Sequence, residues 1–194
     1  MADPRLPQSY DEMMVARRLI FPPSTFALGK DFRPRPDDVI ITPWSKSGTT
    51  WLQQIVHGLR SGGDMDFDDI SRISPWIEVA DALGITLDAD QGWSPRAFKS
   101  HYSYIDVPKG ARYIVSFREP RAVMVSYYRF HEGSMFEPGT VTMAEYLDGY
   151  LKRERGKDYW THLESWWSQR DNPDVLLLSF ELMQEDLRPA VVKV

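Results

Sequence analysis

The strongest structural signal in the chain lies in the run Val39-Ile40-Ile41-Thr42-Pro43-Trp44-Ser45-Lys46-Ser47-Gly48-Thr49-Thr50-Trp51. Its β-branched opening, from Val39 to Thr42, predicts a short buried strand. From Trp51 onward, apolar residues recur with helical spacing up to Leu59, and Gly62 supplies a helix stop. A strand, a glycine-containing loop and a helix in this order open a βαβ unit, which indicates an α/β protein.

Further strands and helices follow this unit along the chain. We expect strands at residues 96–99, 111–117 and 175–178, and helices near residues 75–83, 120–130, 143–151 and 159–168. Residues 1–35 are rich in proline and have no clear period, so we expect an irregular N-terminal segment. Residues 189–194 look like the first turns of a helix, at which the chain stops. We therefore expect a single domain over residues 1–194 that is incomplete at its C-terminus.

Composition and charge narrow the class of protein. The chain has 194 residues, 42% of them hydrophobic, and a formal net charge of −5, which disfavours nucleic acid as a partner. It contains no cysteine, which rules out disulfides and thiolate metal sites. The N-terminus lacks the layout of a signal peptide, and no apolar run has the length of a membrane span. We expect a soluble, cytoplasmic protein.

The loop from Ser45 to Thr50 has the chemistry of an anion-binding site. A helix N-terminus offers backbone N–H groups without partners and a partial positive charge. Small residues let an anion approach that backbone, Lys46 adds a full charge, and Thr49 and Thr50 add hydroxyls. Because the lysine precedes Gly48, this is not the standard ATP-binding pattern. The plainer alternative is a capped helix after a strand, with an incidental lysine.

A second candidate site follows the strand expected at residues 111–117. Arg118 comes at the carboxyl end of that strand, and Ser126 lies about two turns into the helix after it. Ligands of open α/β sheets bind at this edge, where an arginine can fork onto a phosphate and a serine can add a hydroxyl. The alternative for Arg118 alone is a surface arginine paired with Glu119.

A third candidate site, Lys99-Ser100-His101, follows the short strand at residues 96–99. A histidine at such a position can serve as a general base near neutral pH. A lone histidine is more often structural. We expect that structural role for the remaining histidines, which are His57, His131 and His162.

The three motifs, in this order, resemble the cytosolic-type sulfotransferase family. The family's phosphosulfate loop Pro-Lys-Ser-Gly-Thr-Thr-Trp corresponds to residues 45–51, and its Lys-Thr-His to residues 99–101. Its 3'-phosphate motif, Arg-Asx-Pro-Lys/Arg followed by Ser and paired Tyr, corresponds to residues 118–130. A Trp-rich helix at residues 160–167 and a strand end at residues 178–181 extend the resemblance, which covers residues 39–194.

The resemblance implies a fold and a reaction. The fold is a parallel β-sheet flanked by helices, related to P-loop nucleotide kinases. The reaction moves a sulfuryl group from 3'-phosphoadenylyl sulfate (PAPS) to a hydroxyl or amine of a small-molecule acceptor. It releases 3'-phosphoadenosine 5'-phosphate (PAP) and needs no metal. A soluble enzyme without a membrane span is implied, and a homodimer is compatible with the resemblance.

The resemblance also implies residue roles. Lys46 would bind the phosphosulfate and stabilise the leaving phosphate, His101 would be the catalytic base, and Lys99 would line the acceptor site. Trp51 would stack on adenine. The implied cofactor-binding residues are Lys46, Ser47, Gly48, Thr49, Thr50, Trp51, Arg118, Ser126 and Phe180.

The chain departs from the family pattern at several positions. Ser45 replaces a proline, which changes the stiffness of the loop. Glu119 replaces the usual Asp or Asn, which leaves a helix-capping role at this position open. Phe180 stands where many members have an adenine-contacting tyrosine, so a hydroxyl contact is lost. The family's basic Arg-Lys-Gly segment would lie beyond Val194, and we therefore expect the chain alone to bind PAP weakly or not at all.

Two other interpretations of the sequence remain open. One is a truncated, non-catalytic fragment, and the other is a P-loop kinase-like phosphotransferase, which would need an acidic Mg²⁺ ligand. The acceptor is not readable from the sequence. Aromatic residues that are candidates for a partly apolar acceptor pocket are Phe21, Phe26, Trp76, Tyr102, Tyr104 and Phe136.

Overall fold

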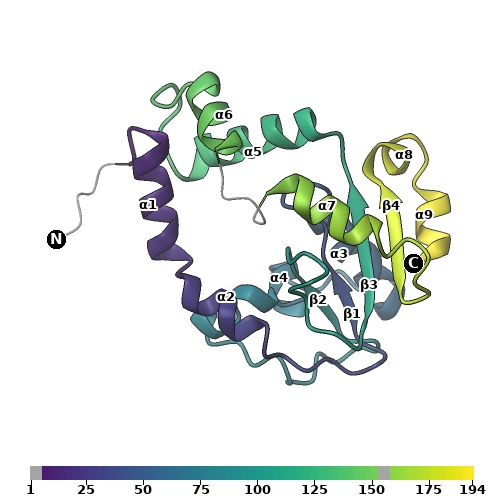
Figure 1. Cartoon of the computed structure of the whole chain (residues 1–194). Helices are drawn as coiled ribbons and strands as arrows, with labels where there is room; N and C mark the ends of the chain where they lie inside the picture. Colours follow the sequence, from purple (N-terminus) through teal and green to yellow (C-terminus); the bar gives the residue numbers. More distant parts are fainter. Residues whose placement is uncertain (1–5, 153–157) are drawn as a thin grey trace.

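Four parallel strands form the centre of the molecule, in the order β2-β1-β3-β4 (Figure 1). The computed structural model describes residues 6–152 and 158–194. The strands are β1 (Val39–Ile41), β2 (Ala97–Lys99), β3 (Arg112–Phe117) and β4 (Val175–Ser179). Ile41 pairs with Lys99 on one side and with Ile114 on the other, so β1 is central. The expected parallel α/β sheet is confirmed.

Helices surround this sheet. The α-helices are α1 (Tyr10–Ile20), α2 (Pro23–Gly29), α3 (Thr49–Ser61), α4 (Ile70–Ile73), α5 (Pro120–Ser134), α6 (Met143–Leu151), α7 (Tyr159–Trp167), α8 (Phe180–Glu185) and α9 (Arg188–Lys193). Two 3-10 helices, η1 (Ile77–Val79) and η2 (Asp81–Leu83), replace the single helix expected near residues 75–83. Within the described ranges, no helix is long and apolar enough to cross a membrane.

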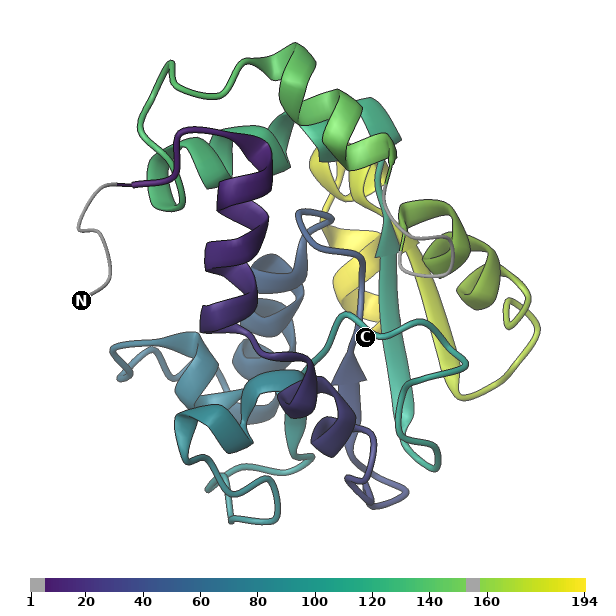
Figure 2. The ribbon, with the colours of Figure 1, turned by 60° about the vertical axis from the view of Figure 1, so that its left-hand side comes forward.

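Alternate side chains of the strands pack into two separate hydrophobic cores, one on each face of the sheet. On one face, Ile40, Phe98 and Val115 belong to a cluster that includes Trp166 of α7. On the other face, Ile41 and Ile114 pack in a cluster with residues of α3, α8 and α9. This alternation follows from the two-residue period of a strand. Figures 1 and 2 show α7 and α3 on opposite sides of the sheet, as βαβ connections require.

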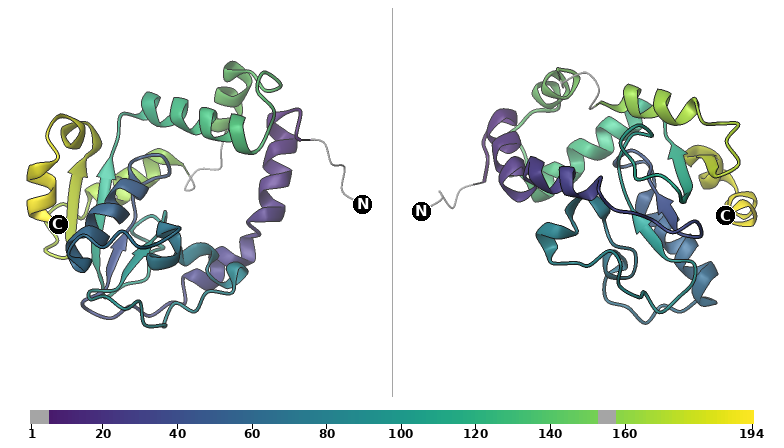
Figure 3. Two further views of the ribbon diagram at one scale, coloured as in Figure 1. Left: turned by 180° about the vertical axis from the view of Figure 1, so that it is seen from behind. Right: turned by 60° about the horizontal axis from the view of Figure 1, so that its bottom comes forward.

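A third core lies away from the sheet, between α1, α5 and α6. It contains Tyr10 and Met13 of α1, Tyr128 of α5 and Tyr146 of α6. Gly149 of α6 faces the Tyr10 ring so closely that a Cβ atom there would lie 2.7 Å from Tyr10 Cγ. Figure 3 shows α1 reaching from α6 to α2 beside the rest of the molecule. The first helix is thus held by aromatic packing at its N-terminal end.

The prediction that residues 1–35 are irregular is wrong for residues 10–29. Ser9 caps α1 by accepting a hydrogen bond from the Glu12 backbone N–H, and Glu12 in turn accepts one from the Gln8 backbone. Pro23 occupies the first turn of α2, where a missing N–H costs nothing. Pro22 and Pro23, which suggested irregular chain, therefore mark a helix start, whereas Pro34 and Pro36 lie in irregular chain before β1.

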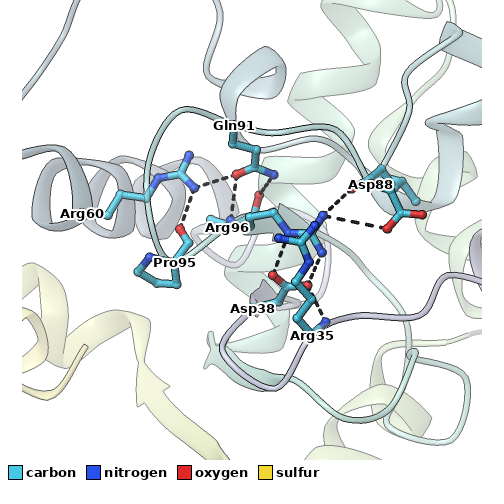
Figure 4. Close-up of polar contacts among 9 residues, drawn as sticks. Arg35, Asp38, Arg60, Asp88, Gln91, Pro95 and Arg96 are labelled. Carbon is cyan, nitrogen blue, oxygen red and sulfur yellow. Dashed lines mark hydrogen bonds and ion pairs between the residues drawn. The ribbon is translucent and has the colours of Figure 1, made fainter.

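A buried ion pair fixes the amino ends of two neighbouring strands (Figure 4). Asp38, just before β1, accepts hydrogen bonds from Arg96 Nε at 2.9 Å and Arg96 Nη2 at 2.6 Å, just before β2. Arg96 is 6% exposed and Asp38 is fully buried. Nearby, Arg60 of α3 donates to the Gln91 side chain and the Pro95 carbonyl. This end of the sheet is structural, which leaves the carboxyl ends for chemistry.

Candidate functional site

All four strands end at one cavity. The loop from Thr42 to Gly48 follows β1, His101 follows β2, Arg118 follows β3, and Phe180 follows β4. The cavity has a volume of about 1910 Å³ and its lining includes Lys46, Lys99, His101, Arg118 and Phe180. In open α/β sheets, ligands bind at the carboxyl edge where the strand order reverses. That reversal lies between β1 and β3, at the loop that carries Lys46.

The loop after β1 has the backbone shape of an anion cradle. Lys46 has a φ of 68° and Gly48 has a φ of 98°, so both lie in the left-handed region. Lys46 is the one non-glycine residue with positive φ among those described. Such a conformation in a lysine costs free energy and is typical of functional sites. The left-handed residues on either side of Ser47 bend the loop sharply in front of α3, where the first N–H groups of the helix have no partner within the helix.

Lys46 projects into the cavity, where its charge is only partly compensated. Its Nζ atom lies 4.2 Å from the centroid of the Phe130 ring on α5. Partial burial and the nearby Arg118 guanidinium lower the pKa of Lys46 from its usual value. An anion that enters the cavity would stabilise this partly buried ammonium by electrostatic attraction.

Arg118 ties the end of β3 to this loop. Its Nη1 donates a hydrogen bond of 2.7 Å to the Lys46 carbonyl, and its guanidinium lies 4.3 Å above the centroid of the Phe180 ring. The Arg118 carbonyl accepts a hydrogen bond of 2.5 Å from the Tyr159 hydroxyl of α7. Arg118 does not pair with Glu119, which binds Arg121 instead. The alternative of a surface arginine paired with Glu119 is therefore wrong.

Several buried polar atoms around the loop have no hydrogen-bond partner among the described residues. They are Ser47 Oγ, Thr49 Oγ1 and Arg118 Nε. Ser47 and Thr49 are both less than 10% exposed, at 0% and 7%. Buried donors of this kind are normally satisfied, so their clustering points to an anionic ligand. The residues present fit a phosphate or phosphosulfate group.

Aromatic side chains form a wall beside the anion cradle. Trp51 in the first turn of α3 and Phe180 at the start of α8 meet edge to face, with ring centroids 5.7 Å apart. A Cβ atom on Gly48 would lie 2.9 Å from the Phe180 ring, so Phe180 requires glycine at that position. Thr50, exposed, and Ser126, half-buried on α5, complete this side of the cavity. A flat base could stack here.

His101 is oriented by a main-chain carbonyl. Its Nδ1 lies 2.8 Å from the Pro43 oxygen, which only accepts hydrogen bonds, so Nδ1 carries the proton and Nε2 is left as an acceptor. Burial and the nearby Lys99 ammonium lower the pKa of His101 to about 3, which keeps the imidazole neutral at physiological pH. This is the protonation state of a general base.

Lys99 lies next to His101, at the end of β2. Its ammonium sits 4.1 Å from the centroid of the Trp76 ring. Burial lowers the pKa of Lys99, whereas the Glu78 carboxylate raises it. Lys99 and His101 thus line the same cavity as Lys46, on the β2 side of the sheet.

Glu78 is a site residue that the sequence analysis did not identify. It lies in η1, is 1% exposed, and lines the cavity next to Lys99 and His101. Its carboxylate accepts a hydrogen bond of 2.5 Å from the His101 backbone N–H. One signal in the sequence could have revealed it: Glu78 is a single charge within the apolar run from Pro75 to Ala80.

Other expectations for the site had mixed outcomes. Glu119 caps α5 by accepting a hydrogen bond from the Ala122 N–H, so the departure from Asp or Asn keeps the cap. Phe21, Phe26, Trp76 and Tyr102 line the cavity. Tyr104 packs against Trp166, and Phe136 is 1% exposed in the core of α1, α5 and α6, so these two are not among the lining residues.

His57 and His162 are buried in core contacts, as expected for structural histidines, whereas His131 is buried but also lies among the residues that line the cavity. His57 is buried between the rings of Phe67 and Trp93. His131 contacts the Tyr146 hydroxyl at 2.8 Å, and His162 Nε2 contacts the Thr42 carbonyl at 3.1 Å. Within residues 6–152 and 158–194, no group of three or more His, Cys, Asp or Glu side chains could hold a metal ion.

Solved structures share this fold. A mouse sulfotransferase complexed with PAP superposes with a TM-score of 0.67 at 22% identity, covering 91% of this chain and 63% of that one. Retinol dehydratase in a complex with retinol and PAP superposes with a TM-score of 0.72 at 15% identity, covering 97% and 73%. At these identities the likeness concerns the fold alone.

Sequence comparison gives the family. Sulfotransferase 1B1 of Canis lupus familiaris is 32% identical over 178 residues, which cover 85% of this chain and 60% of that protein. Sulfotransferase 1E1 of Homo sapiens is 30% identical over 173 residues, which cover 84% and 59%. The chain thus spans about 60% of the length of these relatives. The family model of the sulfotransferase domain matches residues 36–194, and the chain belongs to this family.

Proposed function

We propose that the protein transfers a sulfuryl group from PAPS to a hydroxyl or amine of a small-molecule acceptor. One observation carries this proposal. A single cavity is lined on the β1 and β3 side by an anion cradle, with Lys46 and Arg118, and on the β2 side by an oriented base, His101. Group transfer needs a donor and an acceptor side by side, and this cavity supplies a subsite for each.

The donor subsite follows from the unsatisfied polar atoms. The loop N–H groups, together with the hydroxyls of Thr49 and Thr50, would hold the 5'-phosphate. Arg118 and Ser126 would hold the 3'-phosphate, because Arg118 Nε is buried and has no partner among the described residues. Trp51 and Phe180 would contact the adenine. When bound, PAPS supplies an activated sulfuryl group on a phosphate leaving group.

The catalytic residues would act by moving a proton and by stabilising charge. His101 Nε2 takes the proton of the acceptor hydroxyl, while the acceptor oxygen forms a bond to sulfur and the bond from sulfur to the phosphate oxygen breaks. Lys46 stabilises the negative charge that develops on that phosphate oxygen. Lys99 adds a second positive charge on the acceptor side. Sulfuryl transfer of this kind relies on positioning and electrostatics, as phosphoryl transfer does.

The acceptor would be partly apolar. The side of the cavity next to His101 is lined by Phe21, Phe26, Trp76 and Tyr102. Retinol dehydratase, a protein of similar fold, has been crystallised with retinol and with androsterone, which are largely apolar molecules that carry a hydroxyl. We infer the same general class here, and a screen of phenols, alcohols and amines would identify the member.

Transfer of labelled sulfate from PAPS to a panel of acceptors tests the proposal. We expect sulfated product that forms without added Mg²⁺. Transfer of phosphate from ATP, dependent on Mg²⁺, would instead favour the kinase-like interpretation. Binding of PAP without any transfer would favour a non-catalytic fragment. Two further expectations, a cytoplasmic location and a homodimer, stay predictions that microscopy and light scattering would check.

A further inference from the structure

The proposed reaction assigns no role to Glu78. Its carboxylate is almost completely buried, at 1% exposure, and its Oε2 atom has no hydrogen-bond partner among the described residues. Burial raises the pKa of Glu78 to about 7, well above its usual value. A buried carboxylate without full compensation is costly. Its presence in the wall of the cavity indicates a role in the reaction rather than in stability.

The other oxygen of Glu78 organises the chain after β2. Glu78 Oε1 accepts hydrogen bonds from the His101 N–H at 2.5 Å and from the Ser100 hydroxyl at 3.1 Å. The Ser100 oxygen in turn accepts one from the Tyr102 N–H at 3.1 Å. One carboxylate oxygen therefore fixes three consecutive residues, with His101 in the middle.

The support under Glu78 is rigid. Lys99 N–H donates a hydrogen bond of 2.8 Å to the Pro75 carbonyl, and Trp76 pairs with Lys99 as a parallel bridge, so the chain before η1 extends the sheet. On the other side, Gly29 of α2 lies so close that a Cβ atom there would be 2.9 Å from the Ile77 oxygen. The carboxylate is thus held in place between β2 and α2.

We propose that Glu78 is a positioning residue: its carboxylate fixes the main chain of His101 and places a negative charge in the wall of the cavity that Lys99 also lines. The inference rests on the proposed function, in which His101 is the base. With the backbone held by Glu78 and Nδ1 held by the Pro43 carbonyl, the imidazole is fixed at both ends. The lone pair of Nε2 then points in a fixed direction, as a base in a transfer reaction requires.

Lys99, at the end of β2, is the cation whose charge acts on the Glu78 carboxylate, and its ammonium lies 4.1 Å from the ring centroid of Trp76, two residues before Glu78. Burial lowers the pKa of Lys99, the Glu78 and Asp69 carboxylates raise it, and Lys46 lowers it. Tyr102 also faces the Glu78 carboxylate, with a hydroxyl that donates to the Phe26 carbonyl. From α2, Lys30 is bound to Asp106 at 2.6 Å, and from η2, Asp81 is exposed. Lys99 is therefore the cation that Glu78 affects most.

Two variants, Glu78→Gln and Glu78→Ala, separate the effect of the Glu78 charge from the effect of its hydrogen bonds. The glutamine carboxamide oxygen can still accept from His101 and Ser100, so this variant removes the charge and keeps the geometry. The alanine variant removes both. Glu164→Gln, which removes one negative charge from an exposed position on α7, is the matched control.

The first measurement needs no activity. NMR titration of labelled lysine side chains should show a lower Lys99 pKa in Glu78→Gln than in wild type, because an opposite charge is lost. Glu164→Gln should leave it unchanged. An unaltered Lys99 titration in Glu78→Gln would overturn the electrostatic part of the inference, whether or not the protein transfers sulfate.

The second measurement uses the transfer assay. Glu78→Gln should keep kcat near the wild-type value at the optimum, but the alkaline limb of its pH profile should shift toward neutral pH with Lys99. Glu78→Ala should lose about 100-fold in kcat, since a misplaced base is costly, while its affinity for PAP is unchanged. Full kcat in Glu78→Ala would overturn the positioning part of the inference. Absence of transfer in wild type would instead contradict the proposed function.

Discussion

At the residue scale, Arg118 shows how geometry and charge combine in the site. One guanidinium nitrogen is bound to the Lys46 carbonyl at 2.7 Å, and the plane of the group lies over Phe180. The Nε atom remains buried and without a partner among the described residues. Lysine could supply the charge but neither the planar stacking nor the separate donors. The proposed role of Arg118 in holding a 3'-phosphate can therefore be tested by a substitution that preserves charge.

Arg118→Lys should weaken PAP binding by about 10- to 100-fold, the cost of losing a hydrogen bond to a charged group. It should weaken adenosine 5'-phosphate, which lacks the 3'-phosphate, much less. Titration calorimetry with both ligands measures the difference. Arg121→Lys, at an exposed position three residues on, is the control and should bind both as wild type does. Equal losses for the two ligands in Arg118→Lys would show that Arg118 does not recognise the 3'-phosphate.

The sequence predicts the site residues that belong to local motifs. Lys46, His101 and Arg118 each follow a strand and Lys99 ends one, and a parallel sheet brings such positions together. Contacts between motifs could not be predicted, because they depend on how segments pack. The bond from Arg118 to the Lys46 carbonyl and that from His101 to Glu78 join residues 72 and 23 positions apart. Glu78 was missed for this reason.

At the element scale, α1 depends on one small residue of another helix. Tyr10 lies directly against Gly149 of α6, and its ring meets that of Tyr146 edge to face at 5.4 Å. Residues of α1, including Arg17, line the cavity from the side opposite the sheet. The distance between α1 and α6 therefore sets the position of one wall of the acceptor side.

Gly149→Ala should destabilise the protein by about 1–3 kcal/mol, because the new methyl group overlaps the buried Tyr10 ring. Gly133→Ala is the matched control on α5, where no atom lies within 4 Å of the place that the new methyl group would occupy. It should stabilise by about 0.4–1 kcal/mol, as alanine does in an open helical site. Urea unfolding of both variants gives the comparison. A neutral Gly149→Ala would mean that α1 is not packed on α6.

Helices and strands are predicted best where the periodicity is long. The helix expected at residues 120–130 is present as α5, although it continues past residue 130 to Ser134. Short elements are predicted less well. Residues 75–83 form two 3-10 helices, and the prolines near α1 and α2 obscure the helix cap at Ser9. Propensity alone does not resolve such segments, since tertiary packing decides them.

At the scale of the whole molecule, the two ends of the sheet have different tasks. The carboxyl ends carry the cavity, and the amino ends carry the buried pair of Asp38 and Arg96 (Figure 4). The Asp38 hydrogen bond raises the pKa of Arg96 and keeps it charged. The pair links β1 to β2, the strand that carries Lys99 and His101. Its loss should affect stability before chemistry.

Asp38→Ala should destabilise the protein by about 3–5 kcal/mol, because it removes the buried carboxylate partner of Arg96 and leaves this guanidinium only the Leu87 carbonyl and an exposed Asp88 at 3.9 Å. Asp68→Ala, which breaks an exposed pair with Arg72 at 3.3 Å, should cost no more than about 0.5 kcal/mol. Thermal or chemical unfolding distinguishes the two. Equal, small effects would show that the buried pair contributes little to holding the strands together.

In the proposed reaction, a single cavity holds the sulfuryl donor in the cradle around Lys46 and the base His101 beside it. The most direct measurement is sulfate transfer and PAP affinity in His101→Ala and Lys46→Ala. His101→Ala should bind PAP as wild type does and lose transfer by about 100-fold or more, since only the proton acceptor is removed. Lys46→Ala should lose both PAP affinity and about 100- to 1,000-fold in transfer. A His101→Ala variant that transfers sulfate at the wild-type rate would show that His101 is not the base.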